Sequence, residues 1–421
     1  MTTYNPLRRL KDGAQSLPAA FYQYSGVTFL YWAAMAATLF VPIFLRQQGF
    51  SAFEIGSMSS AFTAISIIAP LVWGVASDKM HSVKWVFAIC LSASAVFWFI
   101  LPHAVRWVSP LIVLLVLPVY KFFSSPTPSL LDSWIVQHVN RDRRVGFGPI
   151  RLWGSIGFAA MAFVYSAILK NASLDTVFYG YALLAAPCVI LALCVREAGD
   201  GPVRPLSLRE MQLSRVIKSK PFLAYLIFSL LINAPIMASF TFLPYLVQAV
   251  GESDAFFGAL AGIEATLEIP MFFFSARLLK RFKLTHLIIA CSCLYTVEMT
   301  LYSICRSPWQ VLLVQSLHGL GYGLYLSSTV QYVFSLAPKN LNATAQTLAS
   351  AASAVAGIIG NFAGGAIVYY FGVRVFFLYS GIFMLAVIAA YFIWLRTHAD
   401  GTNPDGTGPG SDQRGAARAA L

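Results

Sequence analysis

The chain has 421 residues, of which 58% are hydrophobic and 11% are charged. Soluble domains carry roughly 45–50% apolar and about 25% charged residues, so a soluble fold would lack the polar side chains needed to cover its surface. A lipid bilayer accepts such apolar faces. The formal net charge of +12 does not indicate a nucleic-acid partner, because the basic residues form short clusters between long apolar runs. The composition therefore predicts an integral membrane protein whose partner is the lipid bilayer.

Long apolar runs recur along the chain. A helix needs about 20 mostly apolar residues to span a bilayer, and twelve segments approach or exceed that length: 21–45, 52–76, 84–102, 108–133, 147–169, 174–195, 221–248, 254–277, 284–303, 307–335, 343–370 and 373–396. The first run begins near Phe21 and is too long for a signal-peptide core, so we expect it to be retained as the first helix. We predict an all-α membrane protein with twelve transmembrane helices.

The longest polar stretch between the predicted spans covers residues 196–220 and is rich in Gly and Pro. This composition is typical of a linker. It divides the chain into an N-terminal six-helix bundle at 1–195 and a C-terminal six-helix bundle at 221–396. Residues 397–421 are rich in Gly, Asp and Pro, so we expect a disordered tail there.

Positive charges alternate between the two sides of the predicted topology. With both termini placed in the cytoplasm, 22 of the 29 Lys and Arg residues fall in cytoplasmic segments, and two, Lys121 and Arg151, fall within spans. The remaining five fall outside: Arg46, Arg106, Lys170, Arg306 and Arg374. Positive charge is enriched on the cytoplasmic side of membrane proteins. We therefore predict a multi-pass protein of a bacterial inner membrane with both termini, the linker and the tail in the cytoplasm.

The sequence carries no signal for a cofactor, a metal or a catalytic group. The six cysteines lie in or beside apolar runs without a Cys-x-x-Cys pair, so we expect small buried side chains rather than a zinc site or disulfides. No Gly-Lys-Ser/Thr phosphate-binding loop occurs. We expect neither an enzyme nor an ATP-driven machine.

Ionisable residues within predicted spans are costly to bury and mark candidate functional sites. Lys121 and Asp132 lie eleven residues apart in one predicted helix, about three turns, which places them on one face. Arg151 enters the next predicted helix after a short basic loop, so we expect it near Asp132 on the cytoplasmic side. Its guanidinium suits a substrate clamp or a gate. A fixed structural salt bridge is the alternative.

Four further ionisable residues fall in the later predicted spans: Glu264, Glu268, Glu298 and His318. Glu264 and Glu268 are one turn apart, and two carboxylates this close in a low dielectric should not both ionise, as a proton-coupling site requires. The alternative is that Glu268 pairs with a basic residue of a loop. We expect Glu298 either to carry a proton or to pair across a cavity with Lys121 or Arg151. His318 is either a proton site or a structural histidine.

The connection between the second and third predicted spans reads Gly74-Val-Ala-Ser-Asp78-Lys79. A Gly four residues before an Asp–basic pair in this loop resembles the signature of the major facilitator superfamily. Gly permits close helix approach, and the Asp78 carboxylate can accept hydrogen bonds from a neighbouring helix N-terminus. The match is partial, because His81 and Ser82 replace the later Gly and Arg of the signature.

Two stretches, Ser125-Pro-Thr-Pro-Ser-Leu-Leu-Asp132-Ser and Gly146-Phe-Gly-Pro-Ile-Arg151-Leu-Trp-Gly-Ser-Ile-Gly-Phe158, are similar to one branch of this superfamily. That branch contains the lactose permease, phenylpropionate permease and nucleoside/proton symporter groups. The resemblance implies that Asp132 and Arg151 bind substrate together, and that Glu264 or Glu268 is the substrate-linked acid of span eight.

The proton relay of the lactose permeases is only partly present. Gln315-Ser-Leu-His318-Gly-Leu-Gly321 stands at the place of that relay, where His318 is kept and Gly321 replaces the acid. Glu298 stands where that family has a basic residue in span nine. Proton coupling would therefore rest on Glu264, Glu268 or Glu298.

The resemblance implies a secondary active transporter of a small organic solute, working by alternating access between two pseudo-symmetric bundles around a central cavity. We expect a monomer that binds the solute through Lys121, Asp132, Arg151 and Glu268 and moves protons with it. An aromatic carboxylate is the first expectation, because Lys121 and Arg151 lie near the cavity. Alternatives are a sugar or nucleoside symporter, a drug or metabolite efflux carrier, and a non-transporting sensor on a carrier fold.

Overall fold

The computed structural model describes residues 19–141, 147–195, 216–337 and 341–398. Within these ranges the regular secondary structure is helical and contains no strand. Most of the predicted linker at 196–220 and almost all of the predicted tail at 397–421 lie outside the described residues.

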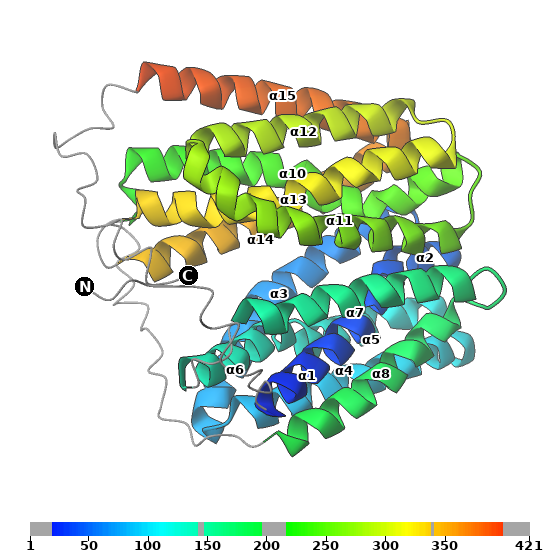
Figure 1. Cartoon of the computed structure of the whole chain (residues 1–421). Helices are drawn as coiled ribbons and strands as arrows, with labels where there is room; N and C mark the ends of the chain where they lie inside the picture. Colours follow the sequence, from blue (N-terminus) through cyan, green and yellow to red (C-terminus); the bar gives the residue numbers. More distant parts are fainter. Residues whose placement is uncertain (1–18, 142–146, 196–215, 338–340, 399–421) are drawn as a thin grey trace, which may run out of the picture.

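The helices run in chain order as labelled in Figure 1. The bounds are α1 (Ala19–Met35), η2 (Ala36–Phe40), α2 (Val41–Gln47), α3 (Ala52–Met80), α4 (Val83–Trp107), η3 (Pro110–Ile112), α5 (Val113–Ser124), α6 (Thr127–Arg141), α7 (Phe147–Ile168), α8 (Asp175–Cys194), α10 (Lys220–Ala249), α11 (Asp254–Arg281), α12 (Leu284–Ile304), α13 (Pro308–Leu336), α14 (Asn342–Phe371) and α15 (Val373–Thr397), where η marks a 3₁₀ helix.

Ten helical segments among the described residues are long and apolar enough to cross a membrane. One of these segments runs from α1 through α2, and another runs from η3 into α6. α11 and α13 are long enough but not among the ten, and both carry buried polar side chains, such as Glu264 in α11 and His318 in α13. Large apolar side chains such as Leu71, Trp107 and Tyr370 face outward, as expected of lipid-facing residues. These helices are those of a multi-pass membrane protein, and the count of twelve spans stays a prediction.

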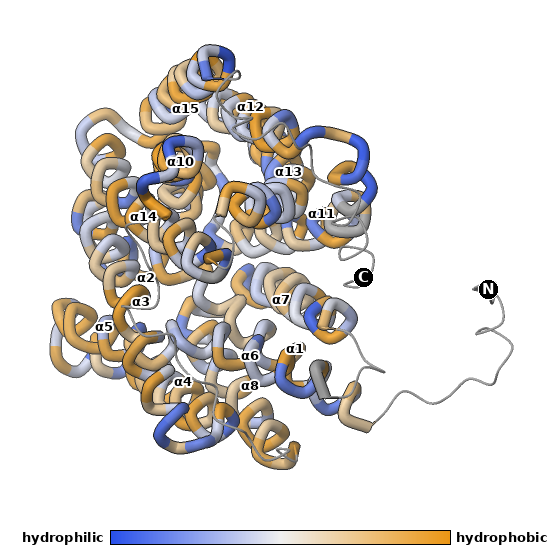
Figure 2. Tube along the Cα trace, turned by 90° about the vertical axis from the view of Figure 1, so that its left-hand side faces the viewer, coloured by the Kyte–Doolittle hydropathy of each residue, from blue (hydrophilic) through white to orange (hydrophobic). Residues whose placement is uncertain are grey.

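Helices α1 to α8 lie together in the lower part of Figure 1, and α10 to α15 lie together above them. The two groups meet mainly where α3 packs against α14 and where α7 packs against α11. Figure 2 shows hydrophilic residues mostly at helix ends and in the turns, with hydrophobic residues along the helix bodies. Buried ionisable side chains inside the helix bodies, such as Glu264, Glu298 and His318, are therefore exceptions.

Close packing around α14 depends on small residues. A Cβ at Gly360 of α14 would collide with the carbonyl oxygen of Ala234 in α10. A Cβ at Gly56 of α3 would collide with the carbonyl oxygen of Asn361 in α14. Glycine removes the side chain that would otherwise keep the backbones apart. α14 is thereby held tightly between α3 and α10.

The fourth predicted span, 108–133, contains a short interruption between two helices. α5 ends at Ser124 and α6 begins at Thr127. Pro126 lies at the break, where it has no N–H to donate and its ring clashes with the carbonyl one turn earlier. One candidate span, Pro110–Val139, still covers this region, so the predicted span is confirmed but consists of two helices divided at this proline.

The break separates the two ionisable side chains of that span. Lys121 lines a pocket to which Asp132 does not contribute, and Asp132 lies beside Arg151 instead. Ser125 N donates to the Lys121 carbonyl and Leu130 N to the Pro126 carbonyl, so helical bonds flank the interruption, and a shared helix face of Lys121 and Asp132 stays a prediction.

Candidate functional site

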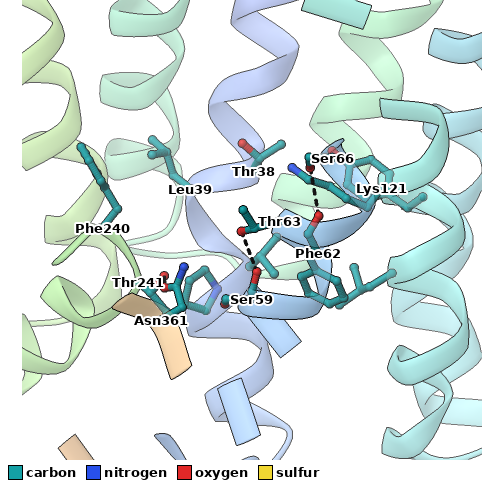
Figure 3. Close-up of a pocket in the computed structure, with 14 residues that line it drawn as sticks. Thr38, Leu39, Ser59, Phe62, Thr63, Ser66, Lys121, Phe240, Thr241 and Asn361 are labelled. Carbon is teal, nitrogen blue, oxygen red and sulfur yellow. Dashed lines mark hydrogen bonds between the residues drawn. The ribbon is translucent and has the colours of Figure 1, made fainter. Parts of the chain in front are cut away.

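Two adjoining pockets lie between the two groups of helices. The larger has a volume of about 390 Å³ and is lined by η2, α2, α3, α5, α10 and α14 (Figure 3). The smaller has a volume of about 260 Å³ and is lined by α1, η2, α7, α10, α11 and α13. Leu39 and Phe240 line both pockets. Together the pockets have the size and the mixed polar and apolar lining of a small-molecule site.

A histidine of α13 lies between two carboxylates. His318 Nδ1 is 3.1 Å from Glu298 Oε1 and 3.2 Å from Oε2, and His318 Nε2 is 3.4 Å from Glu264 Oε1. Glu298 and His318 are each 1% exposed, and Glu264 is 9% exposed. Buried charges require partners, and these three groups supply partners for one another. We call Glu264, Glu298 and His318 the acid–histidine cluster.

Two neighbouring polar side chains extend this cluster. Gln315 Nε2 donates a hydrogen bond to Glu264 Oε2 at 2.5 Å, and Tyr302 Oη donates one to Gln315 Oε1. These bonds hold the Glu264 carboxylate on the side facing α12 and α13. Glu298 has His318 as its partner, so its predicted pairing with Lys121 or Arg151 was wrong. The basic partner of Glu298 is His318 in α13, the helix that follows α12 in the same group of helices.

Glu268 lies one turn after Glu264 in α11, and both line the smaller pocket. Arg151 of α7 and Tyr322 of α13 line the same pocket. One face of α11 therefore presents two carboxylates to a cavity whose opposite wall carries a guanidinium.

The structure places Arg151 beside Asp132, but as a single long ion pair. Arg151 Nε lies 4.0 Å from Asp132 Oδ1, and the side chains are 32% and 40% exposed. The Arg151 guanidinium carbon lies 4.2 Å from the centroid of the Trp32 ring, a cation–π distance. The guanidinium is therefore fixed by an aromatic face rather than by a two-pronged carboxylate contact, and it remains available to the smaller pocket.

Lys121 of α5 lines the larger pocket. Figure 3 shows its side chain pointing across the pocket toward Thr38 and Ser66. The two basic residues expected at the cavity thus lie in different pockets, Lys121 in the larger and Arg151 in the smaller.

The loop motif lies at the end of α3. Asp78 and Lys79 stand in its last turn, and His81 follows with a left-handed backbone, φ 51°. This conformation favours glycine, which the signature has where His81 stands here. A Cβ at Gly74 would meet no atom within 4 Å, so the predicted close helix approach at Gly74 was wrong. The predicted role of the Asp78 carboxylate stays a prediction.

An ion pair that no sequence pattern indicated joins the two groups of helices. Arg46 Nη2 of α2 donates to Asp254 of α11, and Gln47 Nε2 donates to Asp254 Oδ2 at 3.0 Å. Arg46 Nη1 donates to the Pro244 carbonyl of α10 at 3.3 Å. Arg46 was visible only as one of five outside basic residues, because nothing in a single sequence brings the end of the first span to the start of the eighth.

Comparison with known proteins identifies the family. The model of the MFS_1-like family matches residues 21–379. The uncharacterized transporter YwbF of Bacillus subtilis is 26% identical over 347 residues, which cover 81% of this chain and 84% of that protein. The maltose permease of Geobacillus stearothermophilus is 25% identical over 342 residues, 81% of this chain and 85% of the permease. The nucleoside permease NupG of Escherichia coli is 28% identical over 220 residues, about half of each chain (50% and 51%).

Solved structures show the same fold. The crystal structure of the nucleoside transporter NupG superposes with a TM-score of 0.77 at 19% identity, over 89% of this chain and 99% of that one. A bacterial homologue of the lysosomal transporter Spinster superposes with a TM-score of 0.66 at 13% identity, over 94% and 99%. The relatives are transporters, so this chain is a transporter of a small molecule and not an enzyme, and the resemblance to the major facilitator superfamily is confirmed. The protein is a membrane transporter that belongs to the MFS_1-like family.

Proposed function

We propose that the protein is a secondary active transporter that moves a small organic solute together with protons by alternating access. The observation that carries this proposal is the acid–histidine cluster, which is buried among α11 to α13 and reaches the smaller pocket through Glu264. Coupling needs a group that holds a proton beside the substrate in one state and releases it in another. A histidine between two carboxylates meets that need.

The proposed architecture has twelve membrane spans in two pseudo-symmetric six-helix bundles. Residues 1–195 form one bundle, residues 221–396 form the other, and residues 196–220 link them in the cytoplasm. α11 and α13 complete the twelve as spans whose polar side chains face the bundle interior rather than lipid. Inward-facing ionisable groups of this kind are tolerated in membranes when they pair with one another.

Contacts between the two groups of helices support a state closed on one side. Arg46 contacts Asp254, and the Phe40 ring packs against Phe257 with ring centroids 6.3 Å apart. These residues lie at the end of the first span and the start of α11, which are the outer ends of the spans in the proposed topology. The outer side is therefore closed in this conformation, and transport would require these contacts to break.

Protons are proposed to enter the cluster from the smaller pocket. Glu264 and Glu268 line that pocket, whereas Glu298 and His318 are almost fully buried behind Glu264. We assign Glu268 and Glu264 to substrate-linked proton uptake, and His318 with Glu298 to holding the proton away from the cavity. This arrangement differs from a relay with an acid at position 321, where this chain has Gly321.

An aromatic carboxylate is the first candidate solute, because the lining of the two pockets suits it. Lys121 and Arg151 supply positive charge, and Trp32, Phe240 and Tyr322 supply aromatic surface. A guanidinium or ammonium balances a carboxylate, and aromatic rings stack on such walls. Asp132 positions Arg151 in this proposal.

A sugar or nucleoside is the second candidate, because the relatives include a maltose permease and a nucleoside permease. Drug or metabolite efflux and a non-transporting sensor are further alternatives with the same cavity. We also propose a monomer in a bacterial inner membrane with cytoplasmic termini, which agrees with the excess of Lys and Arg in the inner segments. A reporter fused after Leu421 tests this topology; a periplasmic signal would contradict it.

The transport proposal is tested with purified protein in liposomes and a panel of labelled aromatic carboxylates, disaccharides and nucleosides. An inward proton gradient should accumulate one class above its external concentration, and a proton ionophore should abolish the accumulation. Equilibration without accumulation would refute proton coupling. Binding without any flux would favour the sensor.

A further inference from the structure

The two adjoining pockets differ in charge. Lys121 supplies the sole charged side chain among the described residues that line the larger pocket. The smaller pocket is lined by one guanidinium, Arg151, and by the two carboxylates of Glu264 and Glu268. A negative group on a ligand is therefore attracted to the larger pocket and meets two acids in the smaller one.

Lys121 differs from the other basic residues near the interior of the fold. Arg46 and Arg151 each have a carboxylate partner, Asp254 and Asp132. In the part of the chain that the structure describes, the Lys121 side chain has neither an ion pair nor a hydrogen bond, although it is partly buried among apolar helices. An ammonium at such a place is costly until an anion balances it, and Figure 3 shows this one pointing into the larger pocket.

The rim of the larger pocket supplies hydrogen-bond acceptors. Thr38 donates its hydroxyl hydrogen to the Met35 carbonyl at 2.7 Å, Thr63 to the Ser59 carbonyl at 2.8 Å, and Ser66 to the Phe62 carbonyl at 2.9 Å; Figure 3 shows the last two bonds. A hydroxyl whose hydrogen is already donated offers only its oxygen lone pairs to a ligand. The rim therefore favours a ligand that donates hydrogen bonds, such as an alcohol or a phenol.

We propose that the larger pocket is the head-group subsite of the substrate, and that it takes the carboxylate of a hydroxylated organic acid against Lys121. The ligand hydroxyls donate to Thr38, Thr63 and Ser66, and the rest of the ligand extends past Leu39 and Phe240 into the smaller pocket. A single ammonium balances a single carboxylate, so the site favours monoanions over phosphate esters. This inference rests on the proposed function and deepens it by assigning the anion to Lys121 rather than to Arg151.

The test is binding of matched probes to the purified full chain by titration calorimetry, with no proton gradient. The probes are 4-hydroxybenzoate with 4-hydroxybenzyl alcohol, and glucuronate with glucose. We expect at least one acid to bind at least tenfold more tightly than its neutral partner. Lys121→Met should abolish that preference and Lys121→Arg should keep part of it, while Lys220→Met, at the start of α10 and outside this pocket, should leave it unchanged.

The hydrogen-bond acceptors at the rim of the larger pocket are tested by a separate variant. Thr63→Val removes one acceptor, so it should weaken the binding of 4-hydroxybenzoate severalfold and leave the binding of benzoate unchanged. The inference is overturned if neither acid binds, or if the acids bind no more tightly than their neutral partners. It is also overturned if Lys121→Met keeps the preference for the acid, or if glucose 6-phosphate binds more tightly than glucuronate. If the acids bind preferentially but no protons move in liposomes, the proposed proton coupling is overturned and this inference stands. If transport is proton-coupled but does not depend on Lys121, this inference is overturned and the proposed function stands.

Discussion

Arg46 at the end of α2 forms an ion pair with Asp254 at the start of α11, and this pair ties the two groups of helices together at one end of the protein. The side chains are 15% and 26% exposed, so water screens the pair only in part. Gln47 and the Pro244 carbonyl add two further bonds to the same pair of residues. A partly exposed ion pair contributes only about 1 kcal/mol to the stability of a conformation. Such a contact therefore favours this conformation but still allows the protein to leave it.

Breaking this pair should open the outer side more often. With the native cysteines replaced and a Thr38→Cys probe in the larger pocket, Arg46→Gln should raise the rate of labelling by an impermeant maleimide added outside by about fivefold, because about 1 kcal/mol corresponds to that factor. The measurement is the labelling rate in right-side-out vesicles.

Arg106→Gln is the matched control for Arg46→Gln. It breaks the ion pair of Arg106 with Asp175, which joins α4 to α8 within one group of helices. Labelling at Thr38→Cys should not change in this variant. An equal increase in both variants would mean that general loosening, not release of the Arg46–Asp254 pair, exposes the pocket.

Removing charge from the acid–histidine cluster should uncouple transport. Glu298→Gln and His318→Gln each remove a charged hydrogen bond of about 1.5–3 kcal/mol, so gradient-driven accumulation should fall by at least about tenfold, while exchange of labelled for unlabelled solute continues. Glu252→Gln, in the connection between α10 and α11, is the control and should accumulate normally. Undiminished accumulation in both cluster variants would rule out this cluster as the coupling site.

The Asp132–Arg151 pair should matter for function more than for stability. Its single 4.0 Å contact predicts a coupling of less than about 1 kcal/mol in a double-mutant cycle on thermal unfolding. Asp132→Arg and Arg151→Asp should each abolish transport, and the charge-swapped double variant should recover part of it. Absence of any recovery, with the double variant folded, would argue against a functional pair.

His81 holds a left-handed backbone that costs non-glycine residues about 1–2 kcal/mol. His81→Gly should therefore raise the thermal unfolding temperature by roughly 1–2 °C. Met80→Gly, one residue earlier in the helical conformation of α3, should lower it by a similar amount. A decrease with His81→Gly would show that the His81 side chain stabilises the loop.

The helical class and the ionisable residues within helices followed from the sequence, because apolar run length and the charges within such runs are local properties. The family followed instead from the resemblance of a few short stretches, such as those around Asp78, Asp132 and Arg151. The break at Pro126 did not, since a proline kinks a helix in one context and ends it in another. The partner of Glu298 was misassigned because charge alone pointed to Lys121 or Arg151, whereas helix packing brought His318 to it. The contact between Arg46 and Asp254 joins residues 208 positions apart, and only the tertiary structure brings them together.

Proton symport is tested most directly by proton movement in proteoliposomes that contain a pH-sensitive dye. Addition of the transported solute outside, without an imposed gradient, should acidify the interior in the wild type and not in Glu264→Gln. Solute uptake with no change of interior pH, in protein shown to be folded, would contradict proton symport through the acid–histidine cluster.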